Sequence, residues 1–380
     1  MIYYLIINKT MKKVVIIILI IALGISGYFV YLNYINQKSL PGSTVPINQI
    51  IEIKTEQDVA IFVENLDVPW EIAFIDTQTL LVTERKGNLL LFKNQKIIKS
   101  FPITETNQSG EGGLLGIAIH PQYKKNNFIY LYVTTIQNNK RENRVLRYTL
   151  KDELLKFDRN ILTDIRANIF HNAGKISFGP DGYLYVTAGD ALDEPAAQDR
   201  DQLAGKILRI TDEGRIPEDN PFDNPVYSLG HRNPQGLTWD QEGNLWSTEH
   251  GQSGAVSGLD ELNKIIKGMN YGWPDYRGFQ NAAGFISPEI HSGKETWAPG
   301  DSEFYKGIIY FTGLKGEALY GYNPMNKELK KYFAGEYGRL RALTLGPDGF
   351  FYISTSNRGG RGTPKQNDDK IIKVNPEILK

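Results

Sequence analysis

The sequence of 380 residues predicts an all-β fold, a six-bladed β-propeller of four-stranded blades preceded by an N-terminal transmembrane helix. Three observations lead to this expectation. The composition, with 37 Gly, 21 Tyr and 17 Phe, favours strands joined by tight turns. A short turn-and-strand segment recurs along the chain, and an uncharged apolar run lies near the N-terminus. Together they predict a β protein on the export side of a membrane.

The apolar run covers residues 14–32, begins VVIIILIIAL and follows Lys9, Lys12 and Lys13. It is long enough to span a bilayer. The lysines should keep the amino end in the cytoplasm, so the rest of the chain should lie outside. A cleaved signal peptide is the alternative. We therefore expect a single-pass cell-membrane protein with an extracytoplasmic propeller, or a secreted one.

The stretch after the apolar run contains Pro41, Gly42 and Pro46 and is typical of a linker. The expected parts of the chain are a cytoplasmic N-terminus at 1–13, an anchor or signal segment at 14–35, a linker at 36–54 and the propeller at 55–380.

The recurring segment is clearest in GPDGYLYVTAG (179–189), WDQEGNLWSTEHG (239–251) and GPDGFFYISTSN (346–357). Asp-Gly or Glu-Gly favours a tight turn, and the alternating aromatic and β-branched residues after it favour a half-buried strand. Weaker copies cover 72–92, 117–135 and 305–322. Six units over roughly 320 residues give about 50 residues each, the size of a propeller blade. Loops from all blades should then meet at one mouth, where a site is expected.

Composition also excludes several functions. The formal net charge is zero, with 43 basic and 43 acidic residues, so no overall positive field exists to hold nucleic acid. The absence of Cys excludes disulfides, thiolate catalysis and Cys-ligated zinc. An exported chain without disulfides must be stabilised by a sizeable apolar core.

One histidine has a context that suggests chemistry. The segment HNAGKISFGPDGYLYVTAGD begins at His171 and ends at Asp190. His171 precedes one expected strand and Asp190 follows the next, so a hairpin can bring imidazole and carboxylate together. A carboxylate so placed would orient and strengthen a general base. A structural or surface imidazole is the alternative for any single His.

Two loops could line the same mouth. GHRNPQGL (230–237) places Arg232 and Asn233 before a strand, where Arg offers paired donors to a carboxylate or a developing oxyanion. An Asn-Pro turn is the alternative explanation. The Gly-rich loop within 249–274 precedes Asp260 and Glu261, and its carbonyls and carboxylates would suit calcium. It could equally be a solvated loop that caps a short helix.

Arg339 and Arg341 alternate in GRLRALTLGPDG. Residues two apart on a strand point to one face, so the pair could clamp an anion. Ordinary surface charge is the alternative.

Taken in this order, the segments resemble the PQQ-dependent soluble aldose sugar dehydrogenases, the glucose/sorbosone dehydrogenase family of six-bladed propellers. The resemblance runs from about Leu66 to the C-terminus. Its markers are GEGGLLGIAIHP, HNAGKISFGPDGYLYVTAGD, GHRNPQGL, the EHGQ to NYGWP stretch and GRLRALTLGPDG. The resemblance implies oxidation of an aldose at C1 to its lactone, with PQQ and Ca²⁺ as cofactors and an external electron acceptor as partner.

The resemblance also implies roles for single residues. His171 would be the catalytic base, Asp190 its partner, and Arg232 would stand with Asn233 at the reactive carbonyl of the quinone. The implied calcium ligands are backbone oxygens of Gly251 and Gln252 at the PQQ site, and Glu261 and Tyr271 at a second, structural site. The implied clamp on the PQQ carboxylates consists of Lys315, Arg339 and Arg341.

Three positions depart from the family pattern. Glu111 stands where some members have a Gln that contacts PQQ, Gln252 replaces a common Pro, and Lys175 stands where Arg is frequent. An acid near the carboxylates of PQQ would weaken binding unless it is turned away, protonated or bound to calcium.

Two other functions remain open at this point. One is a lactonase-type hydrolytic propeller, in which carboxylates and Asn from several blades hold a metal. The other is a non-catalytic extracellular binding propeller.

Overall fold

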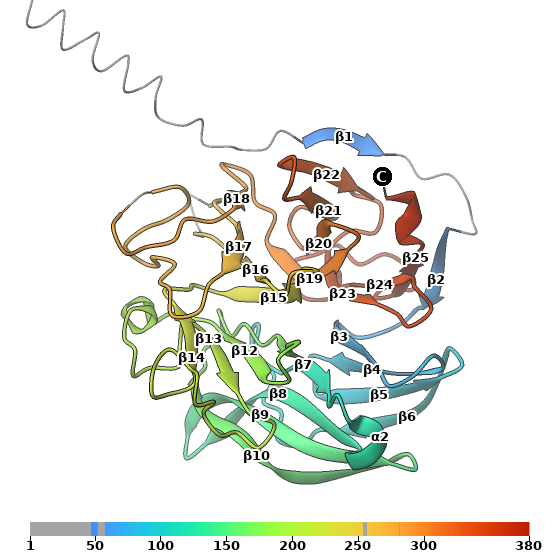
Figure 1. Ribbon diagram of the computed structural model, residues 1–380. Helices are drawn as coiled ribbons and strands as arrows, with labels where there is room; N and C mark the ends of the chain where they lie inside the picture. The colour runs from blue at the N-terminus through green and yellow to red at the C-terminus, as the bar shows by residue number, and fades with distance from the viewer. Residues whose placement is uncertain (1–46, 52–57, 254–256, 281, 380) are drawn as a thin grey trace, which may run out of the picture. The chain divides into compact units, whose positions relative to one another are not determined.

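The computed structural model describes residues 47–51, 58–253, 257–280 and 282–379. Residues 45–380 form one compact unit, whose strands make six sheets. Successive sheets contact one another in chain order, mostly through their innermost strands, and the last sheet contacts the first, so the sheets close into a ring (Figure 1). The predicted six-bladed propeller of four-stranded blades is confirmed.

The first three complete blades follow the chain from the inner strand outward. The first consists of β3 (Pro69–Phe74), β4 (Thr79–Glu84), β5 (Asn88–Lys93) and β6 (Lys96–Pro102). The second consists of β7 (Leu114–Ile119), β8 (Phe128–Gln137), β9 (Lys140–Lys151) and β10 (Leu154–Arg166). The third consists of β11 (Ile176–Phe178), β12 (Leu184–Ala188), β13 (Lys206–Ile210) and β14 (Val226–Leu229).

The next two blades repeat this order. The fourth consists of β15 (Pro234–Trp239), β16 (Leu245–Glu249), β17 (Glu261–Ile265) and β18 (Ile290–His291). The fifth consists of β19 (Pro299–Tyr305), β20 (Ile308–Gly313), β21 (Ala318–Asn323) and β22 (Glu328–Tyr332). Strand β1 (Ile47–Ile51) pairs in parallel with β22, so part of the expected linker is a strand. The outer edge of β22 offers unpaired backbone groups, which a β-rich segment can satisfy.

The last blade joins the two ends of the propeller. Strands β23 (Leu340–Leu345), β24 (Phe351–Thr355) and β25 (Ile371–Val374) are completed by β2 (Val59–Val63), which pairs antiparallel with β25. Next to this pair, Leu66 and Asp369 exchange backbone hydrogen bonds of 2.9 and 3.0 Å between N and O. Because the first and last strands share a blade, the ring closes by hydrogen bonding.

The repeated turns have a common side-chain function. Asp181, Asp240 and Asp348 each accept a hydrogen bond from an aromatic residue of the strand that follows. The donors are Tyr185 Oη at 2.9 Å, Trp246 Nε1 at 3.0 Å and Tyr352 Oη at 3.1 Å from a carboxylate oxygen. The turn glycine in each copy has a φ near +80°, which favours glycine. The repeat is therefore a turn tied to the strand it precedes.

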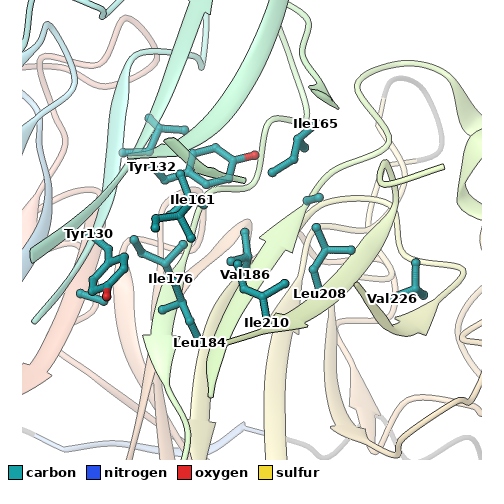
Figure 2. Close-up of a cluster of buried hydrophobic side chains, with 14 of the residues drawn as sticks. Tyr130, Tyr132, Ile161, Ile165, Ile176, Leu184, Val186, Leu208, Ile210 and Val226 are labelled. Atoms are coloured by element: carbon teal, nitrogen blue, oxygen red, sulfur yellow. The ribbon is translucent and has the colours of Figure 1, made fainter. Parts of the chain in front are cut away.

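The core lies between neighbouring blades. Figure 2 shows a cluster of buried hydrophobic side chains from the second and third blades, which contains Tyr130 and Tyr132 of β8 and Leu184 and Val186 of β12. These side chains are fully buried. Burial of aromatic and branched side chains on both faces of each sheet is the main stabilising term in the absence of disulfides.

The helices of the described residues are short: α2 (Tyr123–Asn126), η1 (Glu194–Ala197) and η3 (Pro376–Ile378). No helix in the described part of the chain has the length and apolar character needed to cross a membrane. The predicted anchor at 14–35 lies outside the described residues and stays a prediction.

Candidate active site

Two adjoining cavities lie where loops from several blades meet, as the propeller predicts. The first has a volume of about 550 Å³ and the second of about 410 Å³. Arg85, Lys315, Arg339 and Arg341 line only the first, whereas His171 and Arg232 line only the second of the two. The residues that line both are Glu111, Phe170, His250, Gln252, Ser253 and Arg361.

His171 and Asp190 are paired at the second cavity. The distance from His171 Nδ1 to Asp190 Oδ1 is 2.7 Å, and Asp190 is fully buried. Asp190 also accepts hydrogen bonds from Trp273 Nε1 at 2.8 Å and from the backbone N of Leu192 at 2.9 Å. The structure thus brings together the two residues that the hairpin argument placed side by side. The carboxylate is held from three directions, and it fixes the ring that it contacts.

Close packing of the backbone supports this pair. A Cβ atom on Gly189, next to Asp190, would lie 2.0 Å from the carbonyl oxygen of His171. His171 itself has a φ of +57°, in the left-handed region. A side chain at position 189 would push the His171 loop away from Asp190, so glycine is required there.

The loop before β15 places Arg232 at the second cavity, whereas Asn233 is fully buried and lines neither large cavity. The guanidinium of Arg232 donates from Nη2 to Ser253 Oγ at 2.9 Å, and burial lowers the pKa of this arginine. Asn233 Oδ1 accepts from the backbone N of Ala173 at 3.0 Å. Glu249 holds the same loop in place. Its carboxylate accepts a hydrogen bond from the backbone N of Arg232 and lies 2.8 Å from His231 Nδ1.

Asp260 organises the Gly-rich loop through backbone hydrogen bonds. Its Oδ1 accepts from Gly251 N at 2.8 Å, and its Oδ2 contacts the backbone N of Trp297 and Ala298 at 2.6 and 2.8 Å. The carboxylate is thus engaged by backbone N–H groups, and the residues after it form strand β17 where a short helix was one alternative. A Cβ on Gly251 would lie 2.2 Å from the carbonyl oxygen of Gly258, so the loop can close only on glycine.

Glu261 and Tyr271 line a third, much smaller cavity of about 20 Å³, together with Gly251 and Gln252. Burial, with the nearby carboxylate of Glu249, raises the pKa of Glu261 to about 8. A group of three or more His, Cys, Asp or Glu side chains arranged for a metal is absent from the described residues. A cation at this cavity would therefore depend on backbone oxygens as well as on Glu261.

The first cavity carries a cluster of cations. Arg339 Nη1 donates to the carbonyl oxygen of Leu314 at 3.1 Å, and Arg341 Nη1 donates to Gln235 Oε1 at 3.0 Å. Burial, with the neighbouring cations Arg85 and Arg339, lowers the pKa of Arg341 to about 9. Lys315 lies at the exposed rim of the same cavity. The clustered positive charge is costly in the free protein and suits an anionic ligand.

Several lining residues were missed by the sequence argument. Arg85 follows β4, Phe170 precedes His171, and Arg361 lies in the loop between β24 and β25. None of these three residues belongs to a motif that the sequence analysis singled out. An Arg after a strand was the available signal for Arg85, whereas Arg361 stands in a Gly-rich segment with no periodic pattern.

Lys175, where the family resemblance leads one to expect Arg, lies between two buried carboxylates. Its Nζ donates to Glu71 Oε2 at 2.8 Å and to Asp301 Oδ2 at 2.7 Å. The three residues come from the first, third and fifth blades. This lysine links blades and does not line either large cavity.

Comparison with known proteins bears on what these cavities hold. The model of the glucose / sorbosone dehydrogenase family matches residues 66–365. The chain belongs to the glucose/sorbosone dehydrogenase family. It is therefore an enzyme of a sugar-oxidoreductase family, as the sequence motifs predicted. The matched range covers every residue of the two cavities.

The chain is also similar to individual sugar dehydrogenases. The chain is 30% identical to the aldose sugar dehydrogenase YliI of Escherichia coli, over 84% of this chain and 93% of that protein. It is 32% identical to the quinoprotein glucose dehydrogenase B of Acinetobacter calcoaceticus, over 63% of this chain and 57% of that protein. The solved PQQ-bound aldose sugar dehydrogenase of Streptomyces coelicolor superposes with a TM-score of 0.77 at 34% identity, over 83% of this chain and 97% of that one.

Proposed function

We propose that this family member is a PQQ-dependent aldose dehydrogenase that oxidises a sugar at C1 to its lactone. The observation that carries the proposal is the pairing of His171 with the buried Asp190, beside a cavity lined by arginines. The PQQ-bound and quinoprotein relatives support the cofactor. The sugar follows from the family.

The residues of the first cavity fit PQQ, which is a planar tricarboxylate. Arg85, Arg339, Arg341 and Lys315 supply positive charge around a cavity of about 550 Å³. Among the buried atoms of the described residues that lack a hydrogen-bond partner are four donors at or next to the cavities: Arg85 Nε, Arg232 Nε, Arg339 Nε and Asn233 Nδ2. Unpaired buried donors are costly, so an acceptor-rich ligand at this position would satisfy them. Arg339 and Arg341 would hold carboxylates, and Arg232 with Asn233 would hold the quinone oxygen.

Calcium fits the loop that separates the cavities. Gly251 and Gln252 line the first and third cavities, and carbonyl oxygens are ligands that Ca²⁺ accepts. We propose that Gly251 and Gln252 bind the calcium at the cofactor and that Glu261 with Tyr271 binds a second one.

His171 would act as the general base on the anomeric hydroxyl. Asp190 accepts a hydrogen bond from Nδ1, which leaves Nε2 as the basic nitrogen of the ring. Nε2 takes the hydroxyl proton as the C1–H bond breaks, and Asp190 stabilises the imidazolium that forms. The Arg232 guanidinium stabilises negative charge that develops on oxygen beside it.

When bound, PQQ supplies the acceptor for the hydride from C1, so the sugar loses two electrons and two hydrogens and becomes a lactone. An external electron acceptor would then remove the electrons from the reduced cofactor. The N-terminal segment would hold the propeller outside the cytoplasm, where the sugar and the acceptor are met.

Reconstitution tests the proposal directly. The purified full chain is titrated with PQQ in Ca²⁺ while visible absorbance is followed, and aldose oxidation is then assayed with a dye acceptor. We expect saturable PQQ binding that EDTA weakens, and turnover that depends on both PQQ and an aldose. Absence of binding and of turnover would contradict the proposal. Lactone hydrolysis without PQQ would instead support the hydrolytic alternative, and neither activity would support a binding propeller.

A further inference from the structure

Glu111 occupies an unexpected position for an acid. It stands at the boundary of the two large cavities and lines both of them. The carboxylate of Glu111 interacts electrostatically with four cations of the site. Burial lowers the pKa of these arginines, and the negative charge of Glu111 acts in the opposite direction on Arg85, Arg232, Arg339 and Arg341. A negative group here should compete with an anionic ligand for the same arginines.

Two hydrogen bonds join Glu111 to the loop of the catalytic histidine. The backbone N of Glu111 donates to the carbonyl oxygen of Ile169 at 2.8 Å, and Glu111 Oε2 accepts from the backbone N of His171 at 3.0 Å. The neighbouring Gly110 is packed so tightly that a Cβ would lie 2.1 Å from the Ile169 oxygen. Glu111 thus braces the His171 backbone, which has a positive φ.

The second oxygen of Glu111 is paired with a cation. Arg361 Nη1 lies 3.1 Å from Glu111 Oε1, and the Arg361 guanidinium stacks over the ring of Phe170 at 5.2 Å from its centroid. The Arg361 side chain is 57% exposed, so the pair is reached by solvent and its net stabilisation is small. Its effect on the charge beside the cavities is not small, because it cancels that of Glu111.

We infer that Glu111 and Arg361 form a charge-balanced clasp, in which Glu111 positions His171 through its backbone N–H and Arg361 cancels the carboxylate charge that would repel an anionic cofactor. Glu111 is a positioning residue here. The inference rests on the proposed function for its cofactor, but its positioning part can be measured without one. It accounts for an acid in a site that must bind a tricarboxylate.

The charge part is tested by PQQ titration of variants of the full chain in Ca²⁺. Glu111→Gln keeps an oxygen for the His171 N–H and removes the charge, so PQQ should bind about fivefold tighter at low salt, with a smaller gain at high salt. Glu218→Gln makes the same charge change at an exposed residue outside both cavities and should leave the affinity unchanged. Equal or weaker binding by Glu111→Gln would overturn the charge part.

The pairing is tested by removing its other half. Arg361→Gln leaves the Glu111 charge uncancelled, so PQQ should bind about fivefold more weakly. The double variant restores the net charge and should return to within about twofold of the wild-type affinity, since the two changes act in opposite directions. A double variant that binds as weakly as Arg361→Gln alone would show that the two charges do not cancel.

The positioning part is measured on the cofactor-free protein by NMR of labelled histidine. Glu111→Ala removes the acceptor for the His171 N–H and should shift the ring signals of His171, whereas Glu111→Gln should restore them to the wild-type positions. Unshifted His171 signals in Glu111→Ala would overturn this part. If the wild-type chain fails to bind PQQ, the proposed function is contradicted, and this measurement still decides whether Glu111 positions the histidine.

Discussion

The two large cavities differ in how their charged groups are held. At the second cavity, His171 and Asp190 form a pair whose members satisfy each other, and three donors converge on the carboxylate. At the first, Arg339 and Arg341 lie together with Arg85, and burial lowers the pKa of both cavity arginines. The charged groups of the second cavity are paired in the free protein, whereas those of the first cavity need an anion. Under the proposed function, the second cavity serves proton transfer and the first serves cofactor binding.

The largest effect is expected at the base. His171→Ala should lower kcat about 10³-fold, because positioned proton transfer contributes 10² to 10⁴. The affinity for PQQ should stay at the wild-type value, since His171 lines the second cavity and not the first. Steady-state kinetics and absorbance titration measure the two quantities. A matching loss of PQQ affinity would break the division between the cavities.

A smaller loss is expected when the partner of the base changes. Asp190→Asn should lower kcat about 10²-fold, because an amide cannot stabilise the imidazolium or fix the required tautomer. Asp201→Asn, at an exposed position of the same loop, is the matched control and should retain full turnover. If both variants kept full turnover, His171 would not depend on its carboxylate.

Removing the charge of Arg341 from the first cavity should raise the stability of the PQQ-free protein and lower its affinity for PQQ. Burial lowers the pKa of Arg341 from its ordinary value to about 9, so between these two values the unfolded chain binds more protons and stability rises with pH. At neutral pH the buried charge is destabilising. Arg341→Met should therefore raise the free energy of unfolding of the PQQ-free protein by about 1 kcal/mol and weaken PQQ binding about tenfold.

Chemical denaturation and PQQ titration measure these two changes. Lys315→Met is the matched control, because it removes a cation from the exposed rim of the same cavity. It should weaken PQQ binding without stabilising the chain. Loss of stability in Arg341→Met would show that its contact with Gln235 outweighs the cost of burial.

The smallest effect is expected at the third cavity. Ca²⁺ should raise the Tm of the PQQ-free protein by a few degrees, because an ion that binds only the folded state stabilises it by mass action. EDTA should reverse the shift, and Glu261→Gln should remove most of it. Differential scanning calorimetry measures this. An equal Ca²⁺ shift in Glu261→Gln would place the ion elsewhere.

Local signals in the sequence were enough for the blades. The side chains of Asp181, Asp240 and Asp348 accept hydrogen bonds from strand residues only a few positions away, so these turns can be predicted from the sequence alone. The His171–Asp190 pair was predictable for the same reason, since one hairpin separates the two residues. Asp260 was harder, because a carboxylate beside a Gly-rich loop suggests a metal ligand equally well, and only the structure shows its three backbone donors.

The sequence by itself determined the number of blades, the pairing of His171 with Asp190, and the two arginines Arg339 and Arg341 at the start of β23. Only the tertiary structure decided what faces these groups. Lys175 meets Asp301 across 126 residues, and Arg361 meets Glu111 from the opposite end of the chain. The reason is physical: turns and strands depend on neighbours in sequence, whereas the partner of a charge depends on ring closure, which brings distant blades to one mouth.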